Sequence, residues 1–166
     1  MKNSTKFVVL RHEEGKAFTR TVAGAGSLSQ EIRTQVPSAH FDWMFEQPNA
    51  LRTWSTACVL FPAEDDTVTS RSVLFDVPCD PLPDHRLEYL SYEGEISGDR
   101  GSVRRVLEGS YVPVIDQPDR FEAELQWSDG RQSRCAVISI YRSRRLEEAS
   151  DLDDKRPLWR LSFSTG

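Results

Sequence analysis

The residues best suited to chemistry are the three histidines of the chain, because each stands beside other polar side chains. His40 and Asp42 are two residues apart in a segment that alternates apolar and polar residues, so a β-strand would place both side chains on one face. An imidazole and a carboxylate on one face can bind the same cation. His12 closes an apolar run and precedes Glu13 and Glu14. A single histidine is more often an ordinary surface or hydrogen-bonded residue than a metal ligand, so the spacing alone leaves both interpretations open.

His85 is the third histidine, and Tyr89 follows it four residues later. If residues 85–92 form a strand, both side chains lie on one face, and Glu93 continues that face. Two imidazoles and one carboxylate would suit Mn²⁺, Fe²⁺ or Zn²⁺ and would leave positions open for water and substrate. The hypothesis from spacing alone is therefore a divalent-metal site built around His40 and Asp42, with the second imidazole left open.

The elements that must position these residues are predicted to be short β-strands, because most apolar segments have a period of two. The predicted strands cover residues 6–11, 40–46, 51–60, 72–77, 85–92, 101–107, 110–115, 121–127, 133–142 and 158–163. Turn residues at 47–49 and 129–130 separate neighbouring runs, and the only helix signal is a weak capping box at 27–35. We predict an all-β fold, a single-domain antiparallel β-barrel of roughly eight to ten strands with little helix.

Length and composition agree with one soluble domain. A chain of 166 residues, 38% hydrophobic and 28% charged, corresponds to a single domain over residues 1–166. We expect an inserted loop at 14–36 and a solvated acidic loop at 144–156, for which a partner site is the alternative. No apolar run approaches the ~20 residues of a membrane span, and the net charge of −5 argues against a protein that coats nucleic acid.

The three cysteines, Cys58, Cys79 and Cys135, are far apart and form no Cys-x-x-Cys motif. This pattern excludes a zinc ribbon and a thioredoxin-type site, and it predicts buried free thiols. The N-terminus has no secretory apolar segment, so we expect a cytoplasmic protein that does not associate with membranes.

An ordered set of short motifs resembles the N-terminal 3′-phosphoesterase domain of bacterial DNA ligase D. The matching segments are Phe7–His12, His40–Glu46, Leu51–Trp54, Asp84–Tyr89, Tyr92–Gly94, Gly98–Val103 and Gly109–Tyr111. No single motif is specific, but their order is kept over nearly the whole chain, and all three histidines fall on family positions.

The resemblance implies a compact antiparallel β-barrel that removes a terminal ribonucleoside or a phosphate from DNA 3′ ends during repair. By position, His12, His40 and Asp42 would bind the metal, with Mn²⁺ preferred, while His85 and Tyr89 would contact the phosphate. His85 would be a candidate general acid. Any ligase or polymerase partner would be a separate protein.

The chain departs from the family pattern at Met44, which stands where the family has a phosphate-binding arginine. A thioether has no charge and donates no hydrogen bond, so we expect Arg100, or secondly Arg52, to supply the guanidinium. The alternative is a catalytically silent module on the same barrel that binds a phosphate or a protein without turnover.

Overall fold

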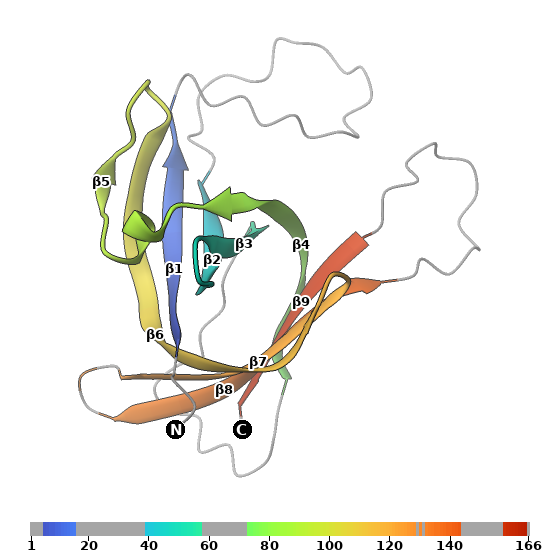
Figure 1. The fold of residues 1–166 in the computed structure, drawn as a ribbon. Helices are drawn as coiled ribbons and strands as arrows, with labels where there is room; N and C mark the ends of the chain where they lie inside the picture. The colour runs from blue at the N-terminus through green and yellow to red at the C-terminus, as the bar shows by residue number, and fades with distance from the viewer. Residues whose placement is uncertain are drawn as a thin grey trace, which may run out of the picture.

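The computed structural model describes residues 5–15, 39–57, 73–128, 130, 132–143 and 158–165. These residues are almost entirely β-structure, with one short 3₁₀ helix (Figure 1). The strands are β1 (Thr5–Glu14), β2 (Ala39–Glu46), β3 (Leu51–Thr56), β4 (Val73–His85), β5 (Gly94–Glu95), β6 (Gly101–Gln117), β7 (Arg120–Ser128), β8 (Ser133–Ser143) and β9 (Leu158–Thr165). The 3₁₀ helix η1 covers Leu87–Leu90. The predicted helix at 27–35, the acidic loop at 144–156 and most of the expected insertion at 14–36 lie outside the described residues.

The nine strands form one antiparallel sheet in the order β1-β2-β3-β4-β9-β8-β7-β6-β5. An additional pairing joins β6 to β1, so eight strands close into a ring and β5 attaches to the outer edge of β6. The prediction of an all-β antiparallel fold is confirmed at this level. No helix in the described part of the chain has the length and apolar content of a membrane-spanning segment.

The interior of the ring is the main hydrophobic core, to which all eight ring strands contribute. Its buried aromatic members are Phe7, Trp43, Phe45, Trp54, Phe75, Tyr111, Phe121 and Phe163. Burying each such side chain contributes about 1.5–3 kcal/mol. Some aromatic pairs are stacked, such as Phe75 and Phe163, and others are edge to face or tilted, with 4.7 Å between the centroids of Phe45 and Phe121.

A second, smaller core lies on the other face of β1, β2 and β3. Its buried residues are Val8, Leu10, Met44, Leu51 and Val103, and Tyr89, Leu90 and Ile96 pack against them. The chain from the end of β4 through η1 and β5 covers this face, so β2 is buried on both sides. The candidate site residues of β1 and β2 share this outer face.

The long strand β4 corrects two predictions. We expected a strand at 72–77 and another at 85–92, but β4 runs without a break to His85, and η1 follows. Three prolines, Pro78, Pro81 and Pro83, lie in β4. They are tolerated because, among the described strands, β4 pairs with β9 as far as Cys79 and with β3 from Cys79 onward. On either side of Cys79 one edge of β4 therefore has no described neighbour, and a missing N–H on that edge costs little.

The strand β6 corrects a third prediction, since 101–107 and 110–115 belong to one strand. Gly109 lies inside β6 and pairs with Phe7 of β1 on one side and Trp127 of β7 on the other. A Cβ at this position would approach the Gln126 carbonyl oxygen to 2.2 Å. Glycine serves here to let three strands approach closely, not to end a strand.

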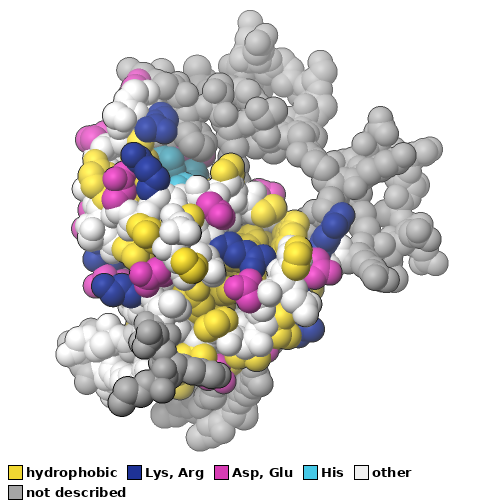
Figure 2. Space-filling view, viewed as in Figure 1, with side chains coloured by type: hydrophobic (Ala, Val, Ile, Leu, Met, Phe, Trp, Pro, Cys, Tyr) yellow, Lys and Arg dark blue, Asp and Glu magenta, His cyan; other side chains and the backbone are white. Residues whose placement is uncertain are grey.

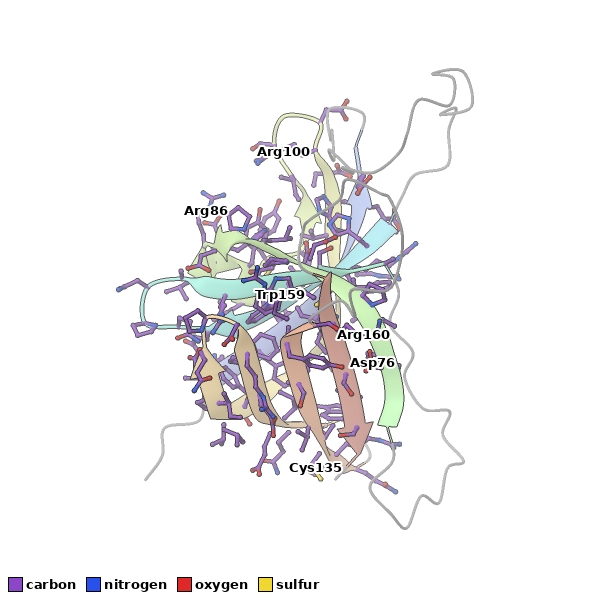
Figure 3. The ribbon with its side chains drawn as sticks, turned by 90° about the vertical axis from the view of Figure 1, so that its right-hand side faces the viewer. Asp76, Arg86, Arg100, Cys135, Trp159 and Arg160 are labelled. Carbon is purple, nitrogen blue, oxygen red and sulfur yellow. The ribbon has the colours of Figure 1, made fainter. Side chains whose placement is uncertain are left out.

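The cysteines only partly follow expectation. Cys79 is a buried free thiol on β4, whereas Cys135 on β8 is exposed. Figure 3 places Cys135 at the end of the molecule opposite Arg86 and Arg100. The expectation of burial is therefore wrong for Cys135, because that end of β8 carries its side chain on the solvent face of the ring, and Cys58 lies outside the described residues.

Candidate metal centre

The antiparallel register of β1 and β2 brings the predicted ligands together. His12 lies directly opposite His40, and Leu10 lies opposite Asp42 one step further along the outer face. Ligand atoms of His12, His40 and Asp42 all lie within 4.8 Å of one another, and all three residues are buried. Two neighbouring strands thus place two imidazoles and one carboxylate around a common point.

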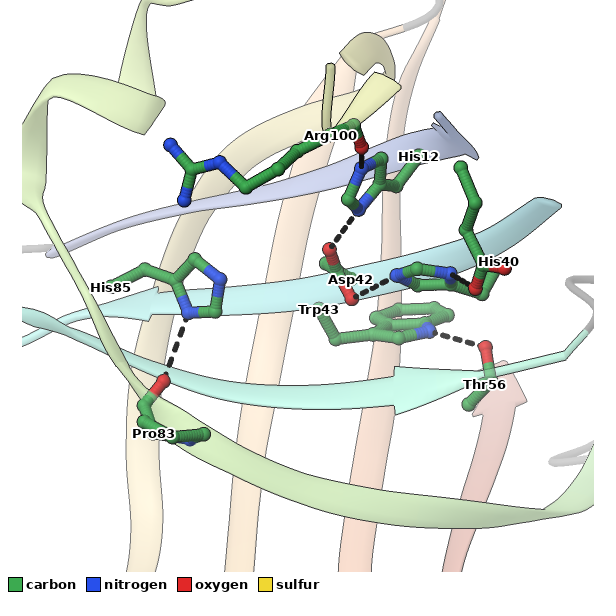
Figure 4. Close-up of polar contacts among 9 residues, drawn as sticks. His12, His40, Asp42, Trp43, Thr56, Pro83, His85 and Arg100 are labelled. Atoms are coloured by element: carbon green, nitrogen blue, oxygen red, sulfur yellow. Dashed lines mark hydrogen bonds and ion pairs between the residues drawn. The ribbon is translucent and has the colours of Figure 1, made fainter. Parts of the chain in front are cut away.

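The outer ring nitrogens of both histidines have protein acceptors (Figure 4). His12 Nε2 lies 2.9 Å from the Arg100 carbonyl oxygen, and His40 Nδ1 lies 3.0 Å from Glu14 Oε1. A carbonyl oxygen only accepts, so His12 Nε2 must be the donor, and Nδ1 then faces Asp42 Oδ2 at 3.8 Å. His40 Nε2 faces Asp42 Oδ1 at 3.4 Å.

Asp42 provides the observation that tests whether these residues fit a metal. Its Oδ1 atom is buried and has no hydrogen-bond partner among the described residues. A buried carboxylate oxygen without a partner costs free energy, and a cation between it and two imidazole nitrogens would remove that cost. The donor set of two imidazoles and one carboxylate suits a divalent transition metal, so the residues fit the expected group.

A pocket of about 130 Å³ opens over this cluster. Its lining consists of His12, His40, Asp42, Met44, Leu82, His85, Tyr89, Ile96, Arg100 and Val103. Three of the residues expected to touch a phosphate, His85, Tyr89 and Arg100, therefore share one pocket with the metal ligands, although they come from β4, η1 and the turn before β6. Figure 2 shows histidine atoms at the surface beside Lys and Arg side chains.

His85 and Tyr89 meet, but not in the predicted manner. His85 is the last residue of β4, and Tyr89 lies in η1, so the expectation of one strand face is wrong. The 3₁₀ turn folds Tyr89 back to an edge-on contact with 5.7 Å between ring centroids. His85 Nδ1 lies 2.9 Å from the Pro83 carbonyl oxygen and donates to it, which leaves Nε2 available for a ligand.

Arg100 is the one arginine or lysine among the described residues that line the pocket. It belongs to the turn between β5 and β6, in which Gly98, Asp99 and Gly101 all have positive φ. Its Nε donates to the Ser97 carbonyl oxygen at 2.8 Å, and its side chain extends toward His85 (Figure 4). The residue thus contributes a backbone acceptor to His12 and a guanidinium to the pocket.

Arg52 does not line the pocket, which corrects the second expectation for a phosphate-binding arginine. Its guanidinium pairs with Asp116 and lies over the rings of Trp54 and Phe121. The reason is register, because Arg52 lies opposite Phe45 and so projects to the inner face of the ring.

Glu14 is the residue that the sequence reasoning noted without giving it a role. The sequence contained a signal for it, because Glu14 is two residues after His12 and a strand places residues two apart on the same face.

Comparison with known proteins adds no assignment: no protein-family model matches the chain, and no curated protein is significantly similar to it.

Proposed function

We propose that the protein is a metal-dependent phosphoesterase, built on a small antiparallel β-barrel, that acts on DNA 3′ ends. The reaction would remove a 3′-ribonucleoside or a 3′-phosphate during DNA repair, with Mn²⁺ as the preferred metal and any ligase or polymerase as a separate partner. One observation carries this proposal: the cluster of His12, His40 and Asp42 shares a pocket with His85, Tyr89 and Arg100.

His12, His40 and Asp42 would hold the metal, which when bound neutralises phosphate oxygens and lowers the pKa of a coordinated water. His85 would act as general acid. Its Nδ1–H is held by the Pro83 carbonyl, so a proton on Nε2 can pass to the leaving oxygen at the pocket. The carbonyl also fixes the ring plane, which keeps the proton donor oriented.

Tyr89 and Arg100 would bind the phosphoryl group. Tyr89 lines the pocket with its ring in contact with the His85 ring, and its hydroxyl would supply a hydrogen-bond donor. The Arg100 guanidinium supplies the positive charge that phosphoryl transfer requires in addition to a metal. Together they would stabilise charge on the non-bridging oxygens as the ester bond breaks.

A second candidate function is a silent binding module on the same fold. Met44 favours it, because this buried thioether lines the pocket at the position where the resembled family carries an arginine. Leu82, Ile96 and Val103 extend the apolar lining. Such a module would bind a phosphate or a protein and would not turn over an ester.

The test is a DNA primer–template whose primer ends in a 3′-phosphate or a single 3′-ribonucleotide, incubated with protein and Mn²⁺. We expect trimmed primer, resolved by denaturing electrophoresis. His85→Ala should lower turnover by about 10²–10⁴-fold while changing primer binding much less, because a proton donor acts mainly in the transition state.

Two tyrosines give a matched control. Tyr89 lines the pocket, whereas Tyr92 is exposed and its hydroxyl donates to the Glu95 carbonyl oxygen. Tyr89→Phe should slow processing, and Tyr92→Phe should leave it unchanged. Primer binding without any product in Mn²⁺, Zn²⁺ or Fe²⁺ would instead establish the binding module.

A further inference from the structure

We propose that Glu14 is a positioning residue of the metal centre, which holds His40 in the tautomer and orientation that a metal requires. The inference rests on the metal centre of the proposed function and is independent of the phosphoesterase reaction. It assigns a task to a carboxylate that no expected ligand set includes.

The placement of Glu14 follows from the strand pair. Glu14 is the last residue of β1 and shares the outer face with His12, which lies directly opposite His40. Glu14 is therefore a diagonal neighbour of His40, a separation that a long side chain can span. Glu14 Oε1 lies 3.0 Å from His40 Nδ1, and the two side chains are only 14% and 5% exposed.

This contact decides which nitrogen of His40 can bind a metal. A carboxylate offers acceptors only, so the proton of the neutral imidazole is held on Nδ1. The lone pair then lies on Nε2, which faces the unpartnered Asp42 Oδ1 at 3.4 Å. In the other tautomer an N–H would point at the position that the ion must occupy.

The same arrangement recurs at His12, with a different acceptor. There the Arg100 carbonyl oxygen accepts from Nε2, and the lone pair of Nδ1 faces Asp42. Histidine ligands commonly donate their second N–H to a carboxylate or carbonyl, and this fixes the ring and raises the basicity of the ligand nitrogen. Among the described residues, both imidazoles are thus oriented by groups outside the ligand set: a backbone carbonyl oxygen at His12 and the Glu14 side chain at His40.

Glu13 supplies a matched control on the opposite face of β1. Its side chain is 50% exposed and pairs with Arg11 Nη1 at 2.6 Å, away from the metal ligands. Replacing Glu13 removes the same negative charge from the same end of the same strand. A difference between the two positions therefore reports contact with His40 and not general electrostatics.

The experiment measures Mn²⁺ affinity by calorimetric titration of the purified chain and its Glu14→Ala, Glu14→Gln and Glu13→Gln variants. We expect Glu14→Ala to weaken Mn²⁺ binding about 10–100-fold. Glu14→Gln should recover part of the loss, because its amide oxygen can still accept from Nδ1. Glu13→Gln should bind as the unmodified chain does.

A spectroscopic readout separates positioning from folding. The visible spectrum of the Co²⁺-loaded protein should change in Glu14→Ala and be unchanged in Glu13→Gln, while metal-free thermal unfolding shows that each variant is folded. Unchanged Mn²⁺ affinity and an unchanged Co²⁺ spectrum in folded Glu14→Ala and Glu14→Gln would overturn the inference. Loss of affinity in a protein that processes no DNA 3′ end would sustain it and refute the phosphoesterase proposal. Absence of Mn²⁺ and Co²⁺ binding in the unmodified chain would overturn both.

Discussion

Asp42 is the residue at which the stability of the metal-free fold and the proposed metal binding oppose each other. It lies between two imidazoles in a buried position, and its Oδ1 has no hydrogen-bond partner among the described residues. A buried charge in this state destabilises the metal-free fold, and a bound cation relieves it. The metal should therefore contribute to folding as well as to chemistry.

Asp42→Asn separates these two effects. The amide removes the buried charge, so the metal-free variant should unfold at the same temperature as the unmodified chain or at a higher one. Mn²⁺ at about 100 times its dissociation constant stabilises a binding protein by ~2.7 kcal/mol. For a chain of this size that corresponds to a rise in Tm of roughly 5–11 °C, which the variant should lose.

Differential scanning calorimetry with and without Mn²⁺ measures this difference. Asp76→Asn is the matched control, because Asp76 pairs with Arg160 on strands away from the metal ligands (Figure 3). It should lower Tm through the lost ion pair and keep the Mn²⁺-dependent rise. The same Mn²⁺-dependent rise in Asp42→Asn would place the ion elsewhere.

At the residue scale much of the site could be predicted, because the alternation of side chains between the two faces of a strand can be read from the sequence alone. Alternation in residues 40–46 correctly assigns Phe41, Trp43 and Phe45 to one face and His40 and Asp42 to the other. The same alternation could not predict the position of Arg52. It shows which residues of one strand share a face, but not which face of the neighbouring strand continues that face. That information lies in the β2–β3 register, which places Arg52 opposite Phe45.

At the scale of elements, the pocket depends on a segment whose structure runs against local sequence signals. Prolines normally argue against a long strand, yet β4 contains three of them, because in the described sheet it has one neighbouring strand on either side of Cys79. The turn into η1 then brings Tyr89 to His85. Both features arise from the tertiary arrangement, so the period-two pattern of residues 85–92 predicted a strand where the chain forms a 3₁₀ helix.

Two glycines of β6 should respond differently to the same substitution. Gly101 has a φ of 100°, and a Cβ there would lie 1.8 Å from the Glu13 carbonyl oxygen, next to the Arg100 carbonyl that accepts from His12. Gly109 is far from the metal ligands, and a Cβ there would meet the Gln126 carbonyl oxygen at 2.2 Å. Both changes to alanine crowd backbone atoms, but only one disturbs the metal centre.

Gly101→Ala should therefore lower the free energy of unfolding and also weaken Mn²⁺ binding by the folded protein. Gly109→Ala should lower the free energy of unfolding by about 1–3 kcal/mol or more, with unchanged Mn²⁺ affinity. Urea unfolding and Mn²⁺ titration of each variant measure the two quantities. Equal Mn²⁺ affinities in the two variants would show that the turn before β6 does not support His12.

At the scale of the whole molecule, alkaline pH should destabilise the fold in a way that can be traced to one thiol. Burial raises the pKa of Cys79 to about 12 from 9.0, and nearby Asp80 adds to the rise. Burial also raises the pKa of Tyr111. Because the folded pKa lies above the unfolded one, the unfolded chain loses its proton first, and stability falls as pH rises from about 9 toward 12.

The expected slope from Cys79 alone is about 1.4 kcal/mol per pH unit within that window. Urea unfolding at a series of pH values measures it, with tyrosine ionisation as a second contribution. Cys79→Val should make the slope shallower, whereas Cys135→Ser, at an exposed thiol, should leave it unchanged. Identical slopes in the Cys79→Val variant and the unmodified chain would contradict the assignment.

The seam between β1 and β6 has a consequence for how the molecule folds. It joins residues that are distant in sequence, from the Thr5 contact with Tyr111 across 106 positions to the His12 contact with Arg100 across 88. Forming contacts between such distant residues costs the chain much conformational entropy before the contacts stabilise it, so these contacts form slowly. The hydrogen bond that orients His12 is made at this seam and is absent from any intermediate in which the ring is open. Interactions that form after the rate-limiting step of folding change the rate of unfolding and leave the rate of folding unchanged. Where the seam closes after that step, a bound metal would therefore prolong the lifetime of the native state without shortening the time the chain needs to reach it.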